Sequence, residues 1–393
     1  MIDYGKMIAD VPRDIKPSGI RRFFDIANSM EGVISLGVGE PDFKTPRRIR
    51  NEGIRTLERG YTGYTANRGL KELLSEISRY VLRKYGVEYN PDGEVLVTVG
   101  GSEAIDLAVR AIVSQGDEVI IPQPSYVCYE PITRLAGGVP VIVETKAENG
   151  FKLTADQLRS KITDRTKLLI LPYPSNPTGA VMERADIEAI SEVLRDTNIA
   201  VISDEIYAEL TFGKKHVSVS SVEGMKERTV LVNGFSKAFA MTGWRLGYLC
   251  APRELCAVMT KIHQYAIMCA PTTSQYAAIK ALCESDEDVC QMVEEYDRRR
   301  RIIVKGFNDI GLECREPFGA FYAFPSIKST GLTSEQFCER LLYSKKVAVV
   351  PGTAFGDSGE GFIRASYCYS LAHIKEALKR IGEFVSELET EKK

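Results

Sequence analysis

Closely spaced metal ligands are missing from the sequence. It contains three histidines, His216, His263 and His373, which have no ligand-like spacing to one another or to pairs of cysteines. Its nine cysteines are an odd number at wide spacings, and no C-x-x-C occurs among them. We therefore expect no metal site and no disulfide framework, but reduced thiols of the kind found in cytoplasmic proteins.

Long apolar runs and an excess of one charge are also missing. No apolar run approaches the ~20 residues that a membrane-spanning helix needs, and the first residues, MIDYGKMIADVPRDIK, are too charged for a signal peptide. The formal net charge of -2 provides no field that would attract nucleic acid. The densest basic run, Arg298–Arg301, follows Glu294, Glu295 and Asp297, so we interpret it as a solvated helix face. These features predict a cytoplasmic protein that binds neither nucleic acid nor membrane.

What the sequence does contain is an alternation of strand and helix patterns. Apolar runs predict strands at 94–100, 117–122, 139–145, 167–174, 198–205 and 229–235. Helical patterns lie between them at 102–114, 126–136 and 183–195, and Thr154 is placed to begin another helix as its N-cap. Strands this apolar are typical of sheets buried on both faces. The alternation predicts an α/β fold with a mostly parallel sheet wrapped by helices.

The C-terminal part has a different pattern. A long charged helical stretch covers 286–310, short strands are expected at 319–325, 347–351 and 361–367, and a last amphipathic helix starts at Ser370. Because a single core stops growing at roughly 250–300 residues, a chain of 393 residues should have one large and one smaller domain. We expect an N-terminal segment (1–40) that joins the small domain or a partner subunit, a large domain (41–285) and a small α+β domain (286–393).

The segment NGFSKAFAMTGWRLGY (233–248) carries the most informative lysine. An arbitrary lysine is a solvated charge, but Lys237 directly follows an apolar strand and precedes small and apolar residues. Desolvation lowers the pKa of a lysine and frees its amine to form a Schiff base. Ser236 and Arg245 offer a hydroxyl donor and a planar charged fork, which suit a phosphate. A lysine in this setting is what pyridoxal phosphate (PLP) requires.

Two further segments follow strands and have both a structural and a functional interpretation. In SDEIY (203–207), Asp204 is either a helix N-cap or the carboxylate that a PLP enzyme places against the pyridine nitrogen. Tyr207 shares a face with Asp204 if the turn is helical. In PYPSNPTGAV (172–181), Asn176 is either part of a rigid turn or an amide that projects into the cleft to donate to the phenolic oxygen of the cofactor.

Two more segments are suited to bind anions. In VGGSEA (99–104), Gly101 and Ser102 stand where a strand ends and a helix begins, and free backbone N–H groups there form an anion site. In GFIRASY (361–367), Arg364 is either an edge charge on a short strand or a fork that binds a substrate carboxylate through two hydrogen bonds.

Taken together, these segments resemble the class I aminotransferases of the fold-type I PLP enzymes, in particular the branch of bacterial and archaeal aspartate and aromatic aminotransferases. The resemblance extends from ISLGVGEPDF (34–43) to GFIRASY and includes, in the family's order, GYTANRGL (63–70), VGGSEA, PSY (124–126), PSNPTGAV, SDEIY, NGFSKAFAMTGWRLGY, GAFYAFP (319–325) and VVPGTAFG (349–356). It implies a large PLP-binding domain with a mostly parallel seven-stranded sheet and a smaller α+β C-terminal domain.

The resemblance also implies a role for each site residue. It assigns Lys237 the Schiff base with PLP and the transfer of a proton between the substrate's α-carbon and the cofactor's C4′ carbon. Around the ring it assigns Asp204 to the pyridine nitrogen, Asn176 and Tyr207 to the phenolic oxygen, and Tyr126 to the ring face. The phosphate is assigned to Gly101, Ser102 and Glu103 through their N–H groups, to Ser236 and to Arg245.

The substrate α-carboxylate is assigned to Arg364, Asn176 and the backbone at Gly37. Tyr64 matches a tyrosine that reaches the phosphate from the neighbouring subunit, which implies a homodimer with shared active sites. The implied reaction is a ping-pong transfer of an amino group between an L-amino acid and a 2-oxo acid.

One position departs from the family's pattern for dicarboxylic substrates. Relatives with that preference carry a lysine where this chain has Ser102. The segment PSGIRRF (17–23) resembles the region that covers the substrate side chain, where Ile20 and Phe24 would favour aromatic or aliphatic groups. We therefore expect an aromatic or broadly neutral amino donor with 2-oxoglutarate as acceptor, and aspartate as the alternative donor.

Three other functions share parts of this pattern. A PLP-dependent carbon–sulfur β-lyase keeps the same Lys, Asp, Asn and Arg set. A non-catalytic PLP-binding regulatory module would carry a DNA-binding helix-turn-helix, for which the chain has no room before residue 34. A dinucleotide-dependent oxidoreductase would have a glycine fingerprint after its first strand, which this sequence lacks.

Overall fold

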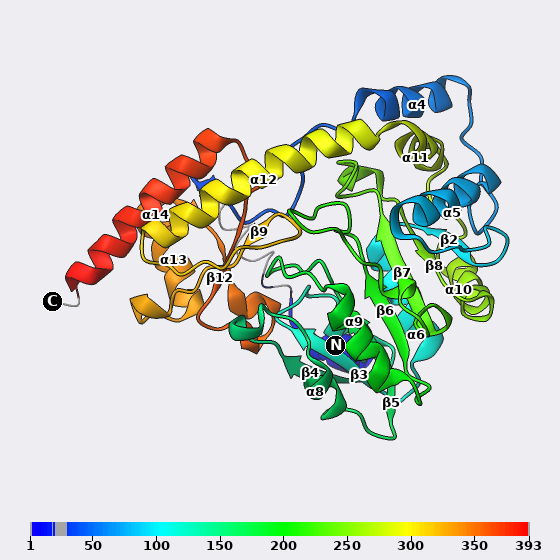
Figure 1. The fold of residues 1–393 in the computed structure, drawn as a ribbon, viewed down its shortest axis with the longest axis horizontal. Coiled ribbons are helices and arrows are strands. Elements are labelled where there is room, and N and C mark those ends of the chain that lie inside the picture. The colour runs from blue at the N-terminus through cyan, green and yellow to red at the C-terminus, as the bar shows by residue number, and fades with distance from the viewer. Residues whose placement is uncertain (1, 18, 20–29, 392–393) are drawn as a thin grey trace.

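The computed structural model describes residues 2–17, 19 and 30–391, and a seven-stranded sheet forms its centre (Figure 1). The strands are β2 (Val95–Thr98), β3 (Glu118–Gln123), β4 (Val139–Glu144), β5 (Thr166–Leu171), β6 (Ala200–Asp204), β7 (Thr229–Gly234) and β8 (Gly247–Cys250). Their spatial order is β2-β8-β7-β6-β5-β3-β4. Of the seven strands, β8 alone runs opposite to the other six, so the mostly parallel sheet is confirmed. Strands β2 to β7 coincide with predicted apolar runs, whereas β8 was not predicted.

The central strands are apolar along their whole length because both faces of the sheet are covered. In β5, Leu168 and Ile170 pack with α6 (Gly101–Ile112) and α10 (Arg253–Ala266) on one face. Leu169 and Leu171 point the other way and pack with α8 (Ala155–Arg159) and α9 (Arg184–Leu194). Side chains alternate across a strand, so a strand between two layers of helices must be apolar at every position.

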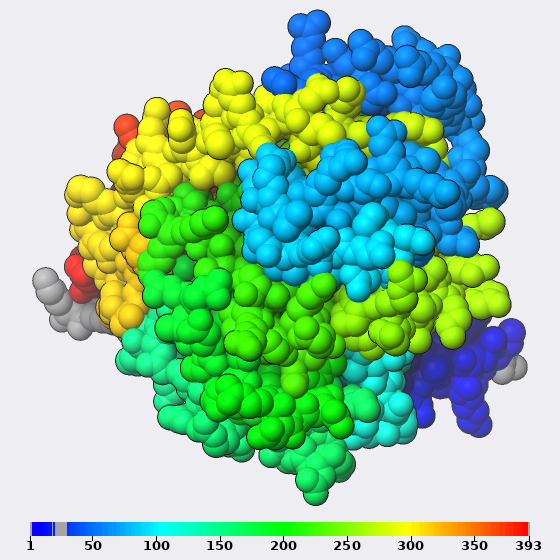
Figure 2. Space-filling view, turned by 45° about the vertical axis from the view of Figure 1, so that its right-hand side comes forward, coloured from blue at the N-terminus to red at the C-terminus, as the bar shows by residue number. Residues whose placement is uncertain are grey.

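Several helices lie beyond this sheet. Helix α8 begins at the predicted N-cap Thr154, which forms a capping box with Gln157. In the described residues before 285, the other α-helices are α1 (Tyr4–Met7), α2 (Asp10–Asp14), α4 (Arg47–Glu58), α5 (Lys71–Tyr85), α7 (Tyr129–Leu135) and α11 (Thr272–Glu284). Helices α4 and α5 both pack against α11, and the sequence interpretation did not anticipate this group. Figure 2 shows the described N-terminal residues in dark blue, projecting at the edge of the molecule.

The C-terminal residues form a second group of elements. It contains α12 (Asp286–Asp309), α13 (Ser334–Lys345), α14 (Leu371–Glu391) and an antiparallel sheet of β11 (Val350–Pro351), β12 (Ile363–Ser366) and β9 (Tyr322–Ala323). Strand β1 (Ile34–Ser35) pairs in parallel with β10 (Val347–Ala348) and so ties the N-terminal segment to this group. The expected boundary at 285 falls between α11 and α12, and α12 runs from the large sheet's side to the C-terminal group (Figure 1).

The basic run in α12 is only partly solvated, so its interpretation as an exposed face was half wrong. Arg298 and Arg301 are exposed, but Arg299 and Arg300 are buried. Each buried arginine has two carboxylate partners: Asp42 and Glu295 for Arg299, and Asp297 and Glu316 for Arg300. Charged groups are buried when their charge is paired, and two of these partners come from distant segments.

The described residues contain neither a membrane-spanning helix nor a cluster of metal ligands. No helix in this part of the chain is long and apolar enough to cross a membrane. Within the same residues, no group of three or more His, Cys, Asp or Glu side chains could hold a metal ion. All nine cysteines are free thiols, of which Cys283 and Cys290 are exposed.

Candidate active site

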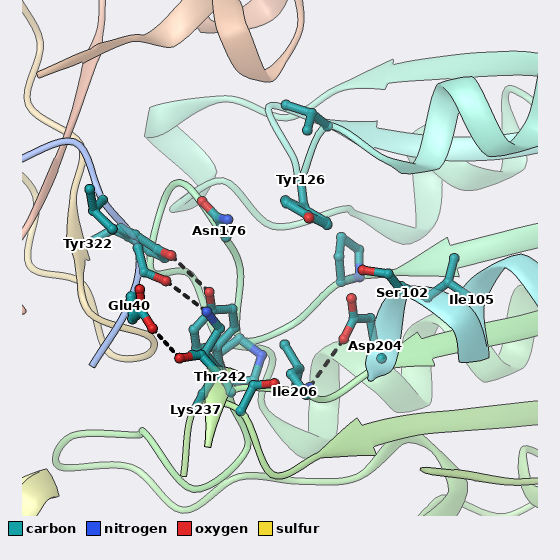
Figure 3. A pocket seen from close by; sticks show the side chains of 18 of the residues that line it. Glu40, Ser102, Ile105, Tyr126, Asn176, Asp204, Ile206, Lys237, Thr242 and Tyr322 are labelled. Atoms are coloured by element: carbon teal, nitrogen blue, oxygen red, sulfur yellow. Dashed lines mark hydrogen bonds between the residues drawn. The ribbon is translucent and has the colours of Figure 1, made fainter. Parts of the chain in front are cut away.

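A cavity of about 690 Å³ opens at the carboxyl ends of the parallel strands, where ligands bind in sheets of this kind. Most of the predicted site residues line it: Gly37, Gly101, Ser102, Tyr126, Asn176, Asp204, Tyr207, Ser236, Lys237, Arg245 and Arg364. They come from segments up to 327 positions apart along the chain. Figure 3 shows Lys237 and Tyr322 on one side of the cavity, and Asp204 and Ser102 on the other.

The other predicted residues lie elsewhere. Glu103 is in the first turn of α6, but its carboxylate accepts a hydrogen bond from the Val99 N–H and lies 2.6 Å from Nδ1 of His263. Tyr64 is 82% exposed and does not line the cavity of its own chain. Ile20, like Phe24, lies outside the described residues.

The amine of Lys237 lies in a largely apolar environment at the end of β7. Burial is the main cause that lowers the pKa of Lys237 from its ordinary value to about 8. Its Nζ donates a hydrogen bond of 2.7 Å to the carbonyl of Gly39 and lies 5.9 Å from the ring centre of Tyr207. With this pKa, roughly a tenth of the amine is neutral at pH 7. Lys237 is therefore suited to act as a nucleophile and as a base.

The carboxylate of Asp204 is buried at the end of β6. Its Oδ2 accepts a hydrogen bond of 2.7 Å from the hydroxyl of Tyr129, and its Oδ1 accepts one of 3.2 Å from the N–H of Ile206. The chain forms a turn here and not a helix, so the N-cap interpretation of Asp204 is wrong. Burial raises the pKa of Asp204, although both hydrogen bonds oppose the shift. A carboxylate in such surroundings favours a cationic partner in the cavity, such as a protonated ring nitrogen.

Arg364 places a positive charge in the wall of the cavity. The residue is 2% exposed and lies in β12, the middle strand of its sheet, so the edge-charge interpretation is wrong. Its guanidinium lies 4.4 Å from the ring centre of Tyr322 and 4.8 Å from that of Phe355. Its hydrogen bonds go to the neutral oxygens of Asn176 and Gly37, at 3.0 and 2.6 Å.

In the part of the chain that the structure describes, the Nε of Arg364 has no hydrogen-bond partner and no carboxylate pairs with the guanidinium. A buried cation without a counter-charge is unfavourable. The site is therefore suited to receive an anionic group, and a carboxylate matches the fork of an arginine.

The hydrogen bond between Arg364 and Asn176 also fixes the orientation of the amide. A guanidinium only donates, so Asn176 must present its Oδ1 to Arg364. Its NH₂ group then points toward the cavity, as Figure 3 shows. Asn176 is thereby a donor for an oxygen atom bound in the cavity, and the rigid turn that carries it supports this role.

Another part of the cavity wall contains groups that are suited to bind a phosphate. Helix α6 begins at Gly101, so its free N–H groups face the cavity beside Ser102. Arg245 has a left-handed backbone with φ of 52°, and its guanidinium packs so closely on Gly100 that a Cβ there would lie 2.9 Å from it. Ser236 lines the same cavity from the turn after β7. A helix N-terminus, two hydroxyls and an arginine that has no carboxylate partner among the described residues are together suited to bind an anion.

The sequence interpretation did not assign roles to two tyrosines of this site. Tyr129 follows Tyr126 by three residues, and this spacing on a helical segment was the available signal. Tyr322 lies in GAFYAFP, which was recognised as a family segment without a role for any of its residues. Its hydroxyl lies 2.9 Å from that of Tyr207, and this pair is marked in Figure 3.

The groups around the cavity fit PLP. Lys237 offers an amine for the aldehyde, Asp204 a buried carboxylate for the ring nitrogen, and the corner at Ser102, Ser236 and Arg245 an anion site for the phosphate. Tyr126 stands between these groups in Figure 3, where it can cover a ring. The donor set therefore matches each polar part of the cofactor.

Comparisons with known proteins agree with this geometry. The family described as Aminotransferase class I and II matches residues 31–381. An aspartate aminotransferase of Pyrococcus abyssi is 46% identical over 95% of this chain and 97% of its own. An aromatic-amino-acid aminotransferase of Thermococcus litoralis is 42% identical over 95% of this chain and 97% of its own.

A solved structure shows the same similarity in three dimensions. The aromatic aminotransferase from Pyrococcus horikoshii superposes with a TM-score of 0.89, at 43% identity, over 93% of this chain and 99% of its own. Such relatives favour transamination over the β-lyase, the regulatory module and the oxidoreductase. The chain therefore belongs to the class I and II aminotransferase family and is a PLP-dependent transaminase.

Proposed function

We propose that this aminotransferase carries PLP on Lys237 and binds the α-carboxylate of its substrates at Arg364. The observation that supports both roles is that one cavity contains an amine with a lowered pKa and a buried guanidinium without a described counter-charge. When bound, PLP supplies an electrophilic aldehyde and a ring that accepts electrons. Transfer in two halves, first from an amino acid and then to a 2-oxo acid, predicts ping-pong kinetics.

The other residues of the cavity hold and orient the reacting groups. The Lys237 amine would take the α-proton of the substrate and deliver a proton to the C4′ carbon of the bound cofactor. Asp204 keeps the ring nitrogen protonated, and Asn176 and Tyr207 donate to the phenolic oxygen. The backbone of Gly37 supports the α-carboxylate beside Arg364.

The remaining groups hold the cofactor in place. Tyr126 covers the ring face. The phosphate is held by the N–H groups of Gly101, Ser102 and Glu103, the side chains of Ser102 and Ser236, and Arg245.

The preferred donor is proposed to be aromatic or neutral. Beyond the groups already assigned, the cavity wall contains the apolar side chains of Val38, Val127 and Ile206 and the ring of Tyr322. The cations that line it are Lys237, Arg245 and Arg364, and each already has a role. A side-chain carboxylate such as that of aspartate therefore finds no dedicated cation among the described residues. As acceptor we propose 2-oxoglutarate, in keeping with the resemblance to the class I aminotransferases.

The first test is the absorption spectrum of the PLP-loaded protein with a panel of donors. Phenylalanine, tyrosine and neutral donors should convert the visible band to that of the amine form, and 2-oxoglutarate should restore it. Lys237→Ala should give no such band. Aspartate should react at least about fivefold more slowly than phenylalanine, since a missing charge partner costs about 1–3 kcal/mol.

Ser102→Lys is the matched variant for specificity, because it supplies the cation found in dicarboxylate-preferring relatives. It should raise the kcat/KM for aspartate relative to phenylalanine by about tenfold. A wild-type protein that reacts with aspartate much faster than with phenylalanine would contradict the proposed donor class. It would leave the role of Lys237 untouched.

A homodimer with shared active sites is part of the proposal. Tyr64 is 82% and Tyr265 90% exposed, and the two lie in segments that are joined by a 2.8 Å hydrogen bond from Asn67 to the carbonyl of Met268. Exposed apolar groups also occur in the N-terminal residues that project in Figure 2: Ile2, Tyr4, Met7, Ile8 and Val11. Apolar surface gathered in this way is typical of an interface. In such a dimer, Tyr64 would reach the phosphate of the neighbouring subunit.

A division into domains and a cytoplasmic location complete the proposal. The division into residues 1–40, 41–285 and 286–393 is supported by the break between α11 and α12 and by the pairing of β1 with β10. A cytoplasmic location is supported by the nine cysteines, which are an odd number at wide spacings.

A further inference from the structure

Tyr322 lines the cavity but has no role in the reaction proposed above. It is 1% exposed, and its hydroxyl lies 2.9 Å from the hydroxyl of Tyr207. The guanidinium of Arg364 lies over the ring of Tyr322, 4.4 Å from the ring centre. A cation in this place is attracted to the aromatic face. Tyr322 therefore contacts both the proposed ligand of the substrate carboxylate and a proposed ligand of the cofactor.

The two hydroxyls come from different sheets. Tyr322 belongs to β9, which pairs with β12, the strand of Arg364. Tyr207 belongs to the turn that follows β6 of the large sheet. The chain also packs tightly on the Tyr322 oxygen, since a Cβ at Gly39 would lie 2.1 Å from it. The hydroxyl of Tyr322 is thus held in one place, and its bond to Tyr207 joins the two sheets across the cavity.

The number of protons determines the direction of this bond. A tyrosine hydroxyl has one proton to donate and can accept further hydrogen bonds. If Tyr207 donates its proton to the phenolic oxygen of the cofactor, it must accept the bond from Tyr322.

We propose that Tyr322 is a positioning residue that donates its hydroxyl proton to Tyr207 and thereby directs the proton of Tyr207 to the phenolic oxygen of PLP. This inference rests on the proposed role of Tyr207 as a ligand of that oxygen. A hydroxyl that receives a hydrogen bond becomes a stronger donor in turn, because the bonds in a chain polarise one another. Tyr322 thus acts through Tyr207.

The test is the pH at which the visible band of the PLP-loaded protein changes, measured in Tyr322→Phe, Tyr207→Phe and the double variant. A donor to the phenolic oxygen stabilises its negative charge most when the neighbouring imine nitrogen is unprotonated, and so lowers the midpoint of this transition. Tyr207→Phe should raise the midpoint by about one pH unit, and Tyr322→Phe by a smaller amount, ~0.3–0.7 units. The double variant should match Tyr207→Phe alone, because Tyr322 has no effect without Tyr207.

Tyr367→Phe is the matched control. It removes a buried hydroxyl that donates to the carbonyl of Ala320 at 3.1 Å, outside the cavity. It should leave the midpoint at the wild-type value. An unchanged midpoint in Tyr322→Phe together with a raised one in Tyr207→Phe would overturn the inference and leave the proposed function intact.

Two other outcomes would also overturn it. A double variant with a midpoint well above that of Tyr207→Phe would mean that Tyr322 acts independently of Tyr207. An unchanged midpoint in both single variants would remove the proposed role of Tyr207 itself, and the inference with it. Because Phe keeps the ring under Arg364, the variant tests the hydroxyl and not the packing.

Discussion

The pKa of Lys237 determines the pH at which the free protein captures its cofactor. Only the neutral amine attacks an aldehyde, and the pKa of this amine is lowered to about 8. The rate of capture should therefore rise about tenfold per pH unit below pH 8 and level off above it. With an ordinary lysine pKa, the rate of capture would keep rising up to pH ~10.4. The growth of the visible band after mixing the cofactor-free protein with PLP, from pH 6 to 10, measures this rate.

A small lysine derivative provides the reference for this prediction. Nα-acetyl-lysine reacts with PLP under the same conditions and reports the titration of the cofactor itself. Dividing the two rates leaves the contribution of the protein. A ratio that shows no inflection between about pH 7 and 9 would contradict the lowered pKa and the burial that causes it.

At the level of single residues, the sequence was sufficient to identify charged residues that stand in an unusually apolar local context. Lys237, Asp204 and Arg364 are charged residues inside or directly after apolar strands, and the structure places all three in one cavity. Tyr129 and Tyr322 could not be assigned from the sequence. The hydroxyl of Tyr129 bonds to Asp204, 75 positions away, and that of Tyr322 to Tyr207, 115 positions away. Only the packing of the folded chain brings these groups together.

The turn after β6 depends on a buried carboxylate next to Asp204. Glu205 is 0% exposed and accepts hydrogen bonds from the hydroxyls of Ser203 and Ser218, at 2.8 and 2.9 Å. It also accepts one of 3.1 Å from the Val219 N–H, and its other oxygen lies 2.7 Å from Nε2 of His216. These contacts attach the turn that carries Asp204 and Tyr207 to the segment 216–219.

Glu205→Ala should lower the free energy of unfolding by about 3–5 kcal/mol. The change leaves several buried donors without an acceptor, and each costs about 1–3 kcal/mol. Urea denaturation of the PLP-free protein measures the loss. Glu188→Ala, which removes an exposed acid from α9, should change the free energy by less than ~0.5 kcal/mol. Equal stability of the two variants would mean that this network contributes little.

At the level of elements, the sequence predicts those that obey a simple periodic rule. Strands β2 to β7 appear as apolar runs because the sheet is covered on both faces. Strand β8 (Gly247–Cys250) was not predicted because it begins inside the segment 233–248, which was interpreted through Lys237 and Arg245 and not as a strand. The burial of Arg299 and Arg300 was not predicted because their partners Asp42 and Glu316 lie outside the local segment of the sequence. A charge run is solvated by default, and only tertiary contacts change that.

At the level of the whole molecule, the proposed dimer predicts that one active site needs two chains. Lys237 lines the cavity of its own subunit, whereas Tyr64 of the same subunit is exposed outside it. Tyr64→Ala and Lys237→Ala should each inactivate a homodimer strongly, the first by weakening phosphate binding and the second by removing the amine. A mixed dimer of the two has one site with neither change, because the intact lysine of one chain meets the intact tyrosine of the other.

Unfolding and refolding the two variants together should therefore restore activity that neither has alone. Random pairing makes about half of the dimers mixed, and each has one intact site of two, so about a quarter of the wild-type activity should return. Refolding each variant separately controls for the procedure, and light scattering confirms the dimer. If the mixture has no more activity than the mean of its parts while the protein is dimeric, Tyr64 acts within its own subunit or not at all. A monomer with full activity would show that a single chain supplies the complete site.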